Sequence, residues 1–121
     1  MDISRFTEKS QKAVSQAQDL AINYGHQQVD TIHLVWALVK QEDGLIPSLL
    51  KKMDVNIPFL INALEKELSK KPRVSGPGIN PGNIYISGDL SRLMVKAVER
   101  AESMNDEYVS VEHIFYTILQ N

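Results

Sequence analysis

One pattern occurs twice in this chain. The two copies are residues 29–38, VDTIHLVWAL, and residues 109–118, VSVEHIFYTI. Subtracting 80 from the later numbers aligns the halves without a gap, so that Ala97 falls on Ala17 and His113 on His33. Few residues are identical, but positions of the same kind recur, which indicates two copies of one structural unit. Because one such unit is too small to bury much surface alone, we expect the copies to pack together.

The first copy has the periodicity of two helices. Apolar residues from Phe6 to Tyr24 recur at steps of three, four and seven, which places them on one helical face. Gly25 follows, and glycine readily takes the left-handed conformation that ends many helices. Asp30 is a good N-cap, because its carboxylate can accept a free amide of the next helix. We expect that second helix to run to about Lys40.

The second copy repeats these starts and stops. Helical periodicity resumes at Asp89 and continues to Met104. Asn105 then falls on Gly25, and asparagine also tolerates the left-handed conformation. Ser110 falls on Asp30, so one N-cap aligns with another, and a last helix should follow it.

Between the two copies lie further helices and a loop. A short helix is predicted around Ile46–Met53, and Asn56 should cap a longer one that ends near Lys71. Residues 72–88 hold most of the proline and glycine, which predicts a loop with a short extended piece at Ile84–Ile86.

The predicted fold is therefore all-α, with two pseudo-symmetric helical repeats in a single domain, residues 1–121. The expected divisions are repeat one at about 4–71, the loop at 72–88 and repeat two at about 89–121. Counterparts of the third and fourth helices would lie 80 positions after 45–71, beyond the last residue, so we expect the second repeat to be incomplete after its second helix. Some apolar surface of the last helix should then be exposed.

Composition excludes several classes of protein. With a net charge of −2, nothing marks the chain as a nucleic-acid binder, which would need a basic face. No apolar run approaches the roughly 18 residues of a membrane span, and the N-terminus lacks the apolar core of a signal peptide. Because the chain has no cysteine, a disulfide framework, a thiol nucleophile and a zinc ribbon are excluded. A cytoplasmic location fits these features.

No motif in the sequence predicts catalysis or cofactor binding. The loop GPGINPG lacks the GK[ST] of a phosphate-binding loop. His26, His33 and His113 show no metal-ligand spacing, and the equivalent placement of the last two favours packing or capping. No nucleophile–base pair is visible, so we expect no enzymatic activity and no cofactor in this chain.

Several large side chains are predicted to belong to the core. Trp36 and Tyr116 are equivalent and lie on the helical core stripe. Met53, Met94 and Met104 are interpreted as core residues, although one of them could line an adaptable groove.

Taken together, the segments FTEKSQKAVSQAQDLAINYGHQQVDTIHLVWALV, KPRVSG and DEYVSVEHIFYTIL resemble the Clp N-terminal repeat domain. The stretch LEKELSKKPRVSG is most similar to the ClpB-type disaggregase branch. The resemblance covers essentially the whole chain. One departure is Asp54, which stands where relatives often carry glycine.

The resemblance implies two four-helix repeats joined by a flexible linker to two AAA+ ATPase modules, in a parent protein that forms a homohexamer. ATP and Mg²⁺ would bind those modules. The parent would thread aggregated polypeptide through its pore together with an Hsp70-type chaperone system. The N-domain would help to recognise unfolded or aggregated protein clients.

The resemblance also points to three substrate-binding residues, Thr7, Asp106 and Glu112, because they match positions implicated in substrate handling. Each has a local alternative: Thr7 can cap the first helix, Asp106 lies in a turn, and the helix dipole favours Glu112. Asp106 aligns with His26 and Glu112 with an isoleucine, so the first copy lacks this acidic edge. We expect a binding groove between the repeats with Asp106 and Glu112 at its rim.

Two other functions remain open at this point. The domain could dock one folded adaptor protein, as the ClpA and ClpC branches do. It could instead act as a regulatory cap that orders the hexamer and gates its pore.

Overall fold

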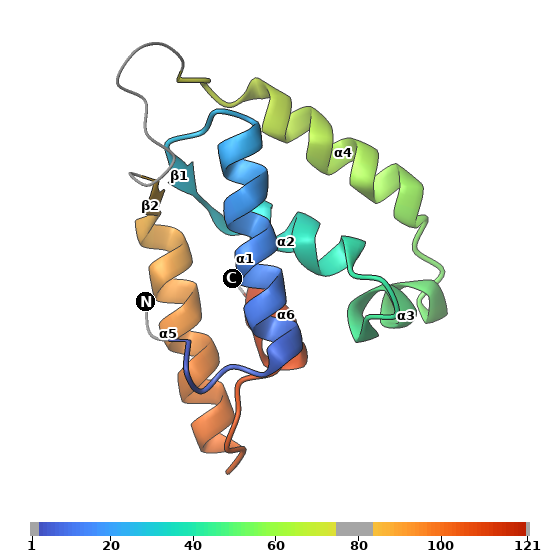
Figure 1. The fold of residues 1–121 in the computed structure, drawn as a ribbon. Coiled ribbons are helices and arrows are strands. Elements are labelled where there is room, and N and C mark those ends of the chain that lie inside the picture. Colours follow the sequence, from blue (N-terminus) through green and yellow to red (C-terminus); the bar gives the residue numbers. More distant parts are fainter. Residues whose placement is uncertain (1–2, 75–83, 121) are drawn as a thin grey trace.

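A computed structural model describes residues 3–74 and 84–120. Within these ranges the chain forms six helices and two very short strands (Figure 1). In chain order they are α1 (Glu8–Asn23), β1 (Gln28–Val29), α2 (Thr31–Lys40), α3 (Leu45–Lys52), α4 (Ile57–Lys70), β2 (Tyr85–Ile86), α5 (Gly88–Ser103) and α6 (Val111–Gln120). The all-α prediction is confirmed. None of the described helices is long and apolar enough to cross a membrane.

The helix ends follow the capping residues. The Asp30 carboxylate accepts the Thr31 amide at 2.8 Å, and the Asn56 side chain accepts the Phe59 amide at 3.1 Å. Helix α5 begins one residue earlier than predicted, because the Ser87 hydroxyl is its N-cap. The segment after each repeat's first helix turns through a left-handed residue, Gly25 (φ 72°) or Asn105 (φ 60°), as the alignment predicts.

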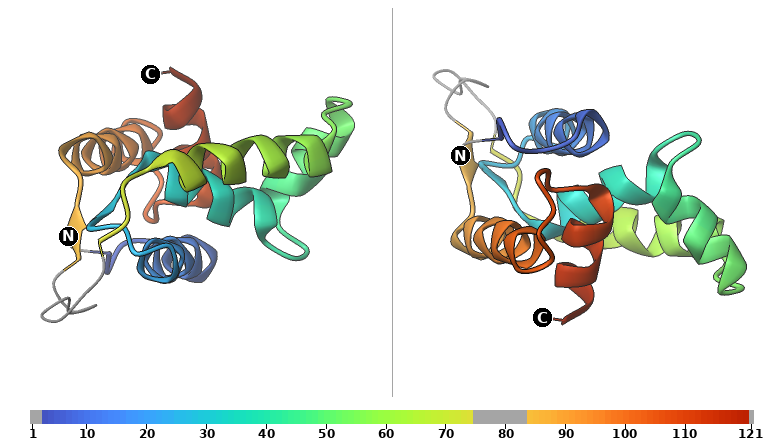
Figure 2. Two further views of the ribbon diagram at one scale, coloured as in Figure 1. Left: turned by 90° about the horizontal axis from the view of Figure 1, so that it is seen from above. Right: turned by 90° about the horizontal axis from the view of Figure 1, so that it is seen from below.

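The two repeats pack against each other. Helices α1 and α2 of repeat one correspond to α5 and α6 of repeat two, and each pair is in contact. Helix α2 also contacts both α5 and α6, which joins the repeats through one core. Figure 2 shows α3 at the opposite end of the molecule from α5 in both views, so the third and fourth helices extend repeat one to one side.

Two parallel β-contacts connect the repeats reciprocally. Val29 of β1 lies opposite Ile86 of β2, and Phe6 lies opposite Val109. With the offset of 80 residues, Ile86 corresponds to Phe6 and Val109 to Val29. Each repeat therefore pairs its Phe6-type position with the Val29-type position of the other repeat. The extended piece at 84–86 is confirmed, whereas β1 was not predicted, because two residues are too few to show a strand period.

Small side chains allow the helices to approach closely. Ala13, Ala17 and Ala21 are buried on α1, and Ala97 and Ala101 are buried at the corresponding positions of α5. The largest fully buried apolar side chains come from both repeats: Leu34, Leu38, Ile46, Leu68 and Ile114. The core is therefore shared between the repeats, as expected for units that cannot bury much surface separately.

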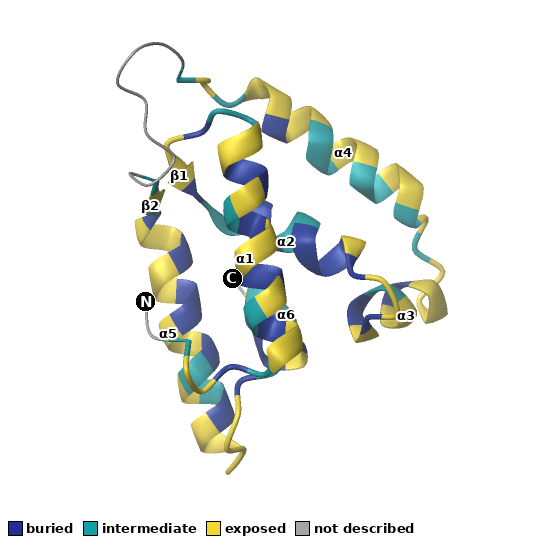
Figure 3. Cartoon of the chain, in the orientation of Figure 1, coloured by how far each residue is buried: buried dark blue, intermediate teal, exposed yellow. Residues whose placement is uncertain are grey.

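Helix α4 lies on the outside of the molecule. Figure 3 shows it exposed along most of its length, and Leu68 is its one buried residue. Met53, predicted to be a core residue, is 63% exposed at the C-cap of α3, so that prediction is wrong. Asp54 follows it in the left-handed conformation (φ 60°), so the turn forms despite the absence of glycine.

Candidate functional site

A pocket of about 680 Å³ lies beside the connection between α5 and α6. Its lining residues are Arg100, Met104, Asp106, Glu107, Tyr108, Ser110, Glu112, His113 and Tyr116. Asp106 and Glu112 therefore share one pocket, whereas Thr7 does not line it. All nine lining residues of this pocket belong to repeat two, and the groove between the repeats stays a prediction.

Three large side chains of the pocket lining are exposed to solvent. Met104 is 59% exposed, Tyr108 52% and Tyr116 50%. Tyr116 was predicted to be buried, and that prediction is wrong. Met104 is not a core residue but lines a pocket, which was the alternative for one of the methionines, and Met94 is buried as predicted.

The equivalent tryptophan explains the exposure of Tyr116. In repeat one, α4 packs against α2, and the Trp36 indole nitrogen donates to the Glu65 carboxylate at 3.4 Å. Trp36 is half-buried, against a prediction of burial. No helix equivalent to α4 covers α6 within the described residues, so Tyr116 stays in solvent. Its ring instead lies 4.2 Å from the Arg100 guanidinium, a cation–π contact.

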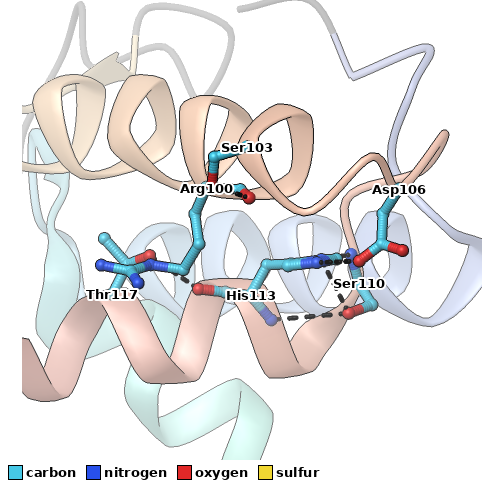
Figure 4. A network of polar contacts seen from close by, with 6 residues as sticks. All are labelled: Arg100, Ser103, Asp106, Ser110, His113 and Thr117. Carbon is cyan, nitrogen blue, oxygen red and sulfur yellow. Dashed lines mark hydrogen bonds and ion pairs between the residues drawn. The ribbon is translucent and has the colours of Figure 1, made fainter.

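A polar network borders the pocket (Figure 4). The Ser110 amide lies 2.9 Å from Nδ1 of His113, and the Ser110 hydroxyl lies at the same distance. Nε2 of His113 lies 2.8 Å from Oδ2 of Asp106. Because Nδ1 accepts the Ser110 amide, we assign the ring proton to Nε2, which donates it to Asp106. His113 thus joins the start of α6 to the preceding turn.

Repeat one has the same network with different partners. Nδ1 of His33 accepts the Asp30 amide at 2.9 Å, and Nε2 lies 2.8 Å from Nδ1 of His26. The same reasoning places the His33 proton on Nε2, which donates to His26. The His26 ring also stacks on Tyr24, with ring centroids 5.3 Å apart.

The histidines of repeat one are buried in surroundings that disfavour their charged forms. Burial lowers the pKa of His33 to about 4, and the adjacent His26 and Lys71 act in the same direction. Burial also lowers the pKa of His26, with Lys71 and Arg73 contributing. Both rings are therefore neutral at pH 7.

Ser110, His113 and Asp106 have the residue types of a hydrolytic triad, but capping explains their arrangement. The Ser110 hydroxyl is also 3.4 Å from the His113 amide, the geometry of an N-cap. Repeat one builds the same contacts with Asp30 in place of the serine and His26 in place of the aspartate. Packing or capping was predicted for His33 and His113, and the structure shows both rings buried and bonded to the N-cap amides. An N-cap followed three residues later by histidine was the sequence signal for these contacts.

The side chain of Thr7 is used in capping α1. Its hydroxyl oxygen accepts the Ser10 amide at 3.2 Å, and the hydroxyl donates to the Ser10 oxygen at 2.9 Å. Its backbone amide donates to the Val109 carbonyl at 3.0 Å, which fixes the chain beside the α5–α6 connection. Thr7 therefore contributes to the structure next to this connection, whereas Asp106 and Glu112 line the pocket.

Glu112 differs from the other two candidates because its side chain is exposed in the first turn of α6. In the part of the chain that the structure describes, no ion pair reaches Glu112. Among those same residues, no group of three or more histidine, aspartate or glutamate side chains could hold a metal ion.

Comparison with known proteins identifies the relatives of this fold. The model of a family described as the Clp repeat (R) N-terminal domain matches residues 5–121. A chaperone protein ClpB from Nitratidesulfovibrio vulgaris is 52% identical over 120 residues, which is 99% of this chain and 14% of that protein. One from Bacillus anthracis is 43% identical over 114 residues, 94% of this chain and 13% of that protein. The chain thus spans about a seventh of the length of these relatives.

Solved structures show the same fold at lower identity. The N-terminal domain of Hsp104 from Candida albicans superposes with a TM-score of 0.83 and 22% identity, covering 96% of this chain and 74% of that one. The N-terminal domain of the ClpV1 ATPase from E. coli gives a TM-score of 0.85 and 18% identity, covering 98% of this chain and 70% of that one.

Proposed function

This chain belongs to the Clp N-terminal repeat domain family, and from that premise we propose that it is a substrate-recognition domain. It would bind unfolded or aggregated polypeptide and pass it to the ATPase modules of a disaggregase or unfoldase. Its relatives are ClpB chaperones, in which the Clp N-domain is a non-catalytic part. We place ATP and Mg²⁺ in those modules, and we include in the proposal a homohexameric parent, an Hsp70-type partner system and a cytoplasmic location.

The observation that supports this proposal is the exposure of three large side chains in the pocket lining. Met104, Tyr108 and Tyr116 present large apolar surfaces to solvent within one concavity. Exposed apolar side chains that gather in one place, with a polar rim, are typical of protein-binding surfaces. Tyrosine and methionine also suit varied partners, since one offers a rigid ring with a polar tip and the other an adaptable chain.

Binding at this pocket should be weak and tolerant of sequence. An unfolded client loses conformational freedom when it docks, which offsets much of the gain from apolar burial. Several copies of the domain in one assembly would raise the effective affinity through multivalency.

The proposal is tested by following amide NMR shifts while a permanently unfolded polypeptide is added. We expect shifts around Tyr108, Glu112 and Tyr116. A folded domain that shows no shifts at roughly millimolar client would contradict the proposal, because even weak capture is detectable there. That result would favour adaptor docking or pore regulation instead.

A pair of variants makes the test specific to the pocket. Tyr116→Ser should weaken client binding, because it removes apolar surface from the pocket. Phe59→Ser is the matched control: Phe59 is 72% exposed on α4 and lies outside the pocket. If both variants weakened binding equally, capture would be a general property of exposed aromatic side chains and not of this site.

A further inference from the structure

A second pocket, of about 460 Å³, lies between α1 and α2 of repeat one. Its lining residues are Lys9, Lys12, Gln16, Asp19, Leu20, Asn23, Trp36, Lys40, Gln41 and Glu42. It has no lining residue in common with the pocket beside the α5–α6 connection, so the two are separate surfaces. The lining on α1 extends from Lys9 to Asn23, which is about 21 Å along a helix. That length suits an extended segment of about six residues.

Three lysines gather at one end of the α1–α2 pocket. The buried Gln41 side chain donates from Nε2 to the Lys9 carbonyl at 2.8 Å, which holds the end of α2 beside the first turn of α1. Lys40 precedes Gln41, and Lys12 lies three residues after Lys9, on the same side of α1. The three lysine side chains are exposed and line this end, which we call the basic end.

The basic end has an excess of positive charge. Glu42 is the one carboxylate of the lining near it, because Asp19 lies seven residues beyond Lys12, about 10 Å along α1. Glu8 and Asp43 do not line the pocket. Helix α1 begins here and α2 ends here, so the partial charges of the two dipoles have opposite signs and largely cancel. Among the described residues, no ion pair reaches any of the three lysines, which leaves them available to an anionic ligand.

Next to the basic end the pocket is apolar. Trp36 lies one turn before Lys40 on α2 and is half-buried, and Leu20 of α1 is buried in the same lining. The indole nitrogen donates to Glu65 of α4 at 3.4 Å, and the Lys40 ammonium lies 5.4 Å from the ring centroid. An apolar side chain that packs on this ring thus places its sequence neighbours near the lysines.

Repeat two does not have these charges. With the offset of 80 residues, the counterparts of the three lysines are Asp89, Arg92 and Gln120. Asp89 and Arg92 form an ion pair with each other, so the aligned end of α5 presents no excess of positive charge. The three lysines are therefore not a requirement of the repeat fold.

We propose that the α1–α2 pocket docks an extended acidic segment of a partner protein. One large apolar residue of the segment would pack on Trp36, and adjacent carboxylates would meet the three lysines. The backbone of the segment would bond to Gln16 and Asn23 at the far end, because amide side chains both donate and accept. This interaction goes beyond capture of unfolded clients, since it uses another surface and selects for negative charge.

The expected preference for acidic segments is moderate, because each ion pair at an exposed site contributes little. Two carboxylates should tighten binding about three- to tenfold relative to two amides at low salt. The difference should shrink as ionic strength rises, since salt screens exposed charges.

The experiment follows the fluorescence of Trp36, which is the single tryptophan of the chain. Short peptides with one central leucine and two adjacent variable positions, both Glu, both Gln or both Lys, are added to the folded domain. We expect the emission to change as the leucine packs on the indole, with affinity in the order Glu above Gln above Lys. Emission that the Glu peptide leaves unchanged up to roughly millimolar concentration would overturn the proposal. Equal affinities, or the reverse order, would overturn it as well.

Paired variants assign the preference to the basic end. Lys9→Gln combined with Lys12→Gln should remove most of the Glu-over-Gln difference while the Gln peptide binds as before. Both side chains are exposed, so the fold should be kept. Lys51→Gln combined with Lys52→Gln is the matched control, because it removes the same charge from the end of α3, outside the pocket. If both pairs reduced the preference equally, overall charge and not this site would attract the peptide, and the proposal would fail.

Discussion

The His26–His33 pair of repeat one and the Asp106–His113 pair of repeat two occupy the same place in their repeats and differ in their surroundings. Both pairs are seven residues apart and meet at 2.8 Å. In repeat one both rings are buried, whereas in repeat two His113 is buried and Asp106 is exposed at the pocket beside the α5–α6 connection. The second histidine of each pair is thus part of the helix start, and its partner varies with the environment.

The two pairs show which contact both helix starts need and which partner can differ between the repeats. His33 and His113 each accept the amide of their own N-cap residue at 2.9 Å, so both helices need this ring. The partner needs only an acceptor for the Nε2 proton. A neutral imidazole suits the buried position, and a carboxylate suits the exposed one, because a buried charge is costly.

The largest effect should come from removing the buried ring. His33→Ala should lower the free energy of unfolding by about 4 kcal/mol, because it leaves a cavity, an unpaired Asp30 amide and an unpaired His26 nitrogen. His113→Ala should have about half that effect, since water can reach its partner Asp106. Urea denaturation of both variants measures the difference. Equal losses would mean that the two environments do not differ energetically.

Acid should destabilise the domain through repeat one. The pKa of His33 is lowered to about 4 from its usual 6.5, so below pH 6.5 the unfolded chain binds protons that the folded chain does not. Stability should therefore fall as pH drops from 6.5 to 4, by about 3 kcal/mol from His33. The lowered pKa of His26 adds to this loss. Denaturation midpoints across this range measure the slope.

His33→Gln is the control for the acid effect. Glutamine at the third helical position can accept the Asp30 amide, so the cap is kept while the titrating ring is removed. Its stability should change less between pH 6.5 and 4 than that of the wild type. An identical slope would place the acid-sensitive groups elsewhere.

Exchanging the partner residues of the two capping histidines should cost unequal amounts of stability. His26→Asp places a carboxylate in the buried position and should cost about 2 kcal/mol, in spite of the nearby Lys71. Asp106→His recreates the repeat-one pair at an exposed position and should change stability by less than about 1 kcal/mol. Thermal unfolding of the two variants is sufficient to compare them. A larger cost for Asp106→His would reverse the assignment of buried and exposed partners.

The smallest difference in stability loss between the repeats should come from the left-handed residues that follow α1 and α5. Gly25→Ala should cost about 1.5 kcal/mol, because alanine is strained at a φ of 72° and its Cβ would lie 3.3 Å from the Val74 carbonyl oxygen. Asn105→Ala should cost about 1 kcal/mol or less, since asparagine already bears a Cβ at a φ of 60°. Unfolding curves for the pair resolve this. Equal costs would indicate that strain dominates at both positions.

Helix ends could be predicted from the sequence because they depend on local chemistry. Asp30, Asn56 and Gly25 each act through neighbours within a few residues, and all three behave as predicted. The capping role of His33 and His113 could also be predicted from the sequence, because each lies three residues after an N-cap residue.

The errors concern contacts between distant parts of the chain. Tyr116 lies on the same stripe as Trp36, but its burial depends on a covering helix that the described residues do not provide. The location of the pocket within repeat two could not be predicted either, because it depends on how α5, α6 and their connection are placed in space.

The reciprocal β-contacts bear on how such a domain could arise. Phe6 pairs with Val109, and Ile86, the counterpart of Phe6, pairs with Val29, so each repeat gives and receives the same contact. Two identical chains exchanging this contact would form a closed two-fold dimer, since such an interface is self-complementary. Fusing them into one polypeptide keeps the interface and raises the effective concentration of each half for the other. One half can then diverge, and here the second copy carries Asp106 and Glu112 where the first has His26 and Ile32.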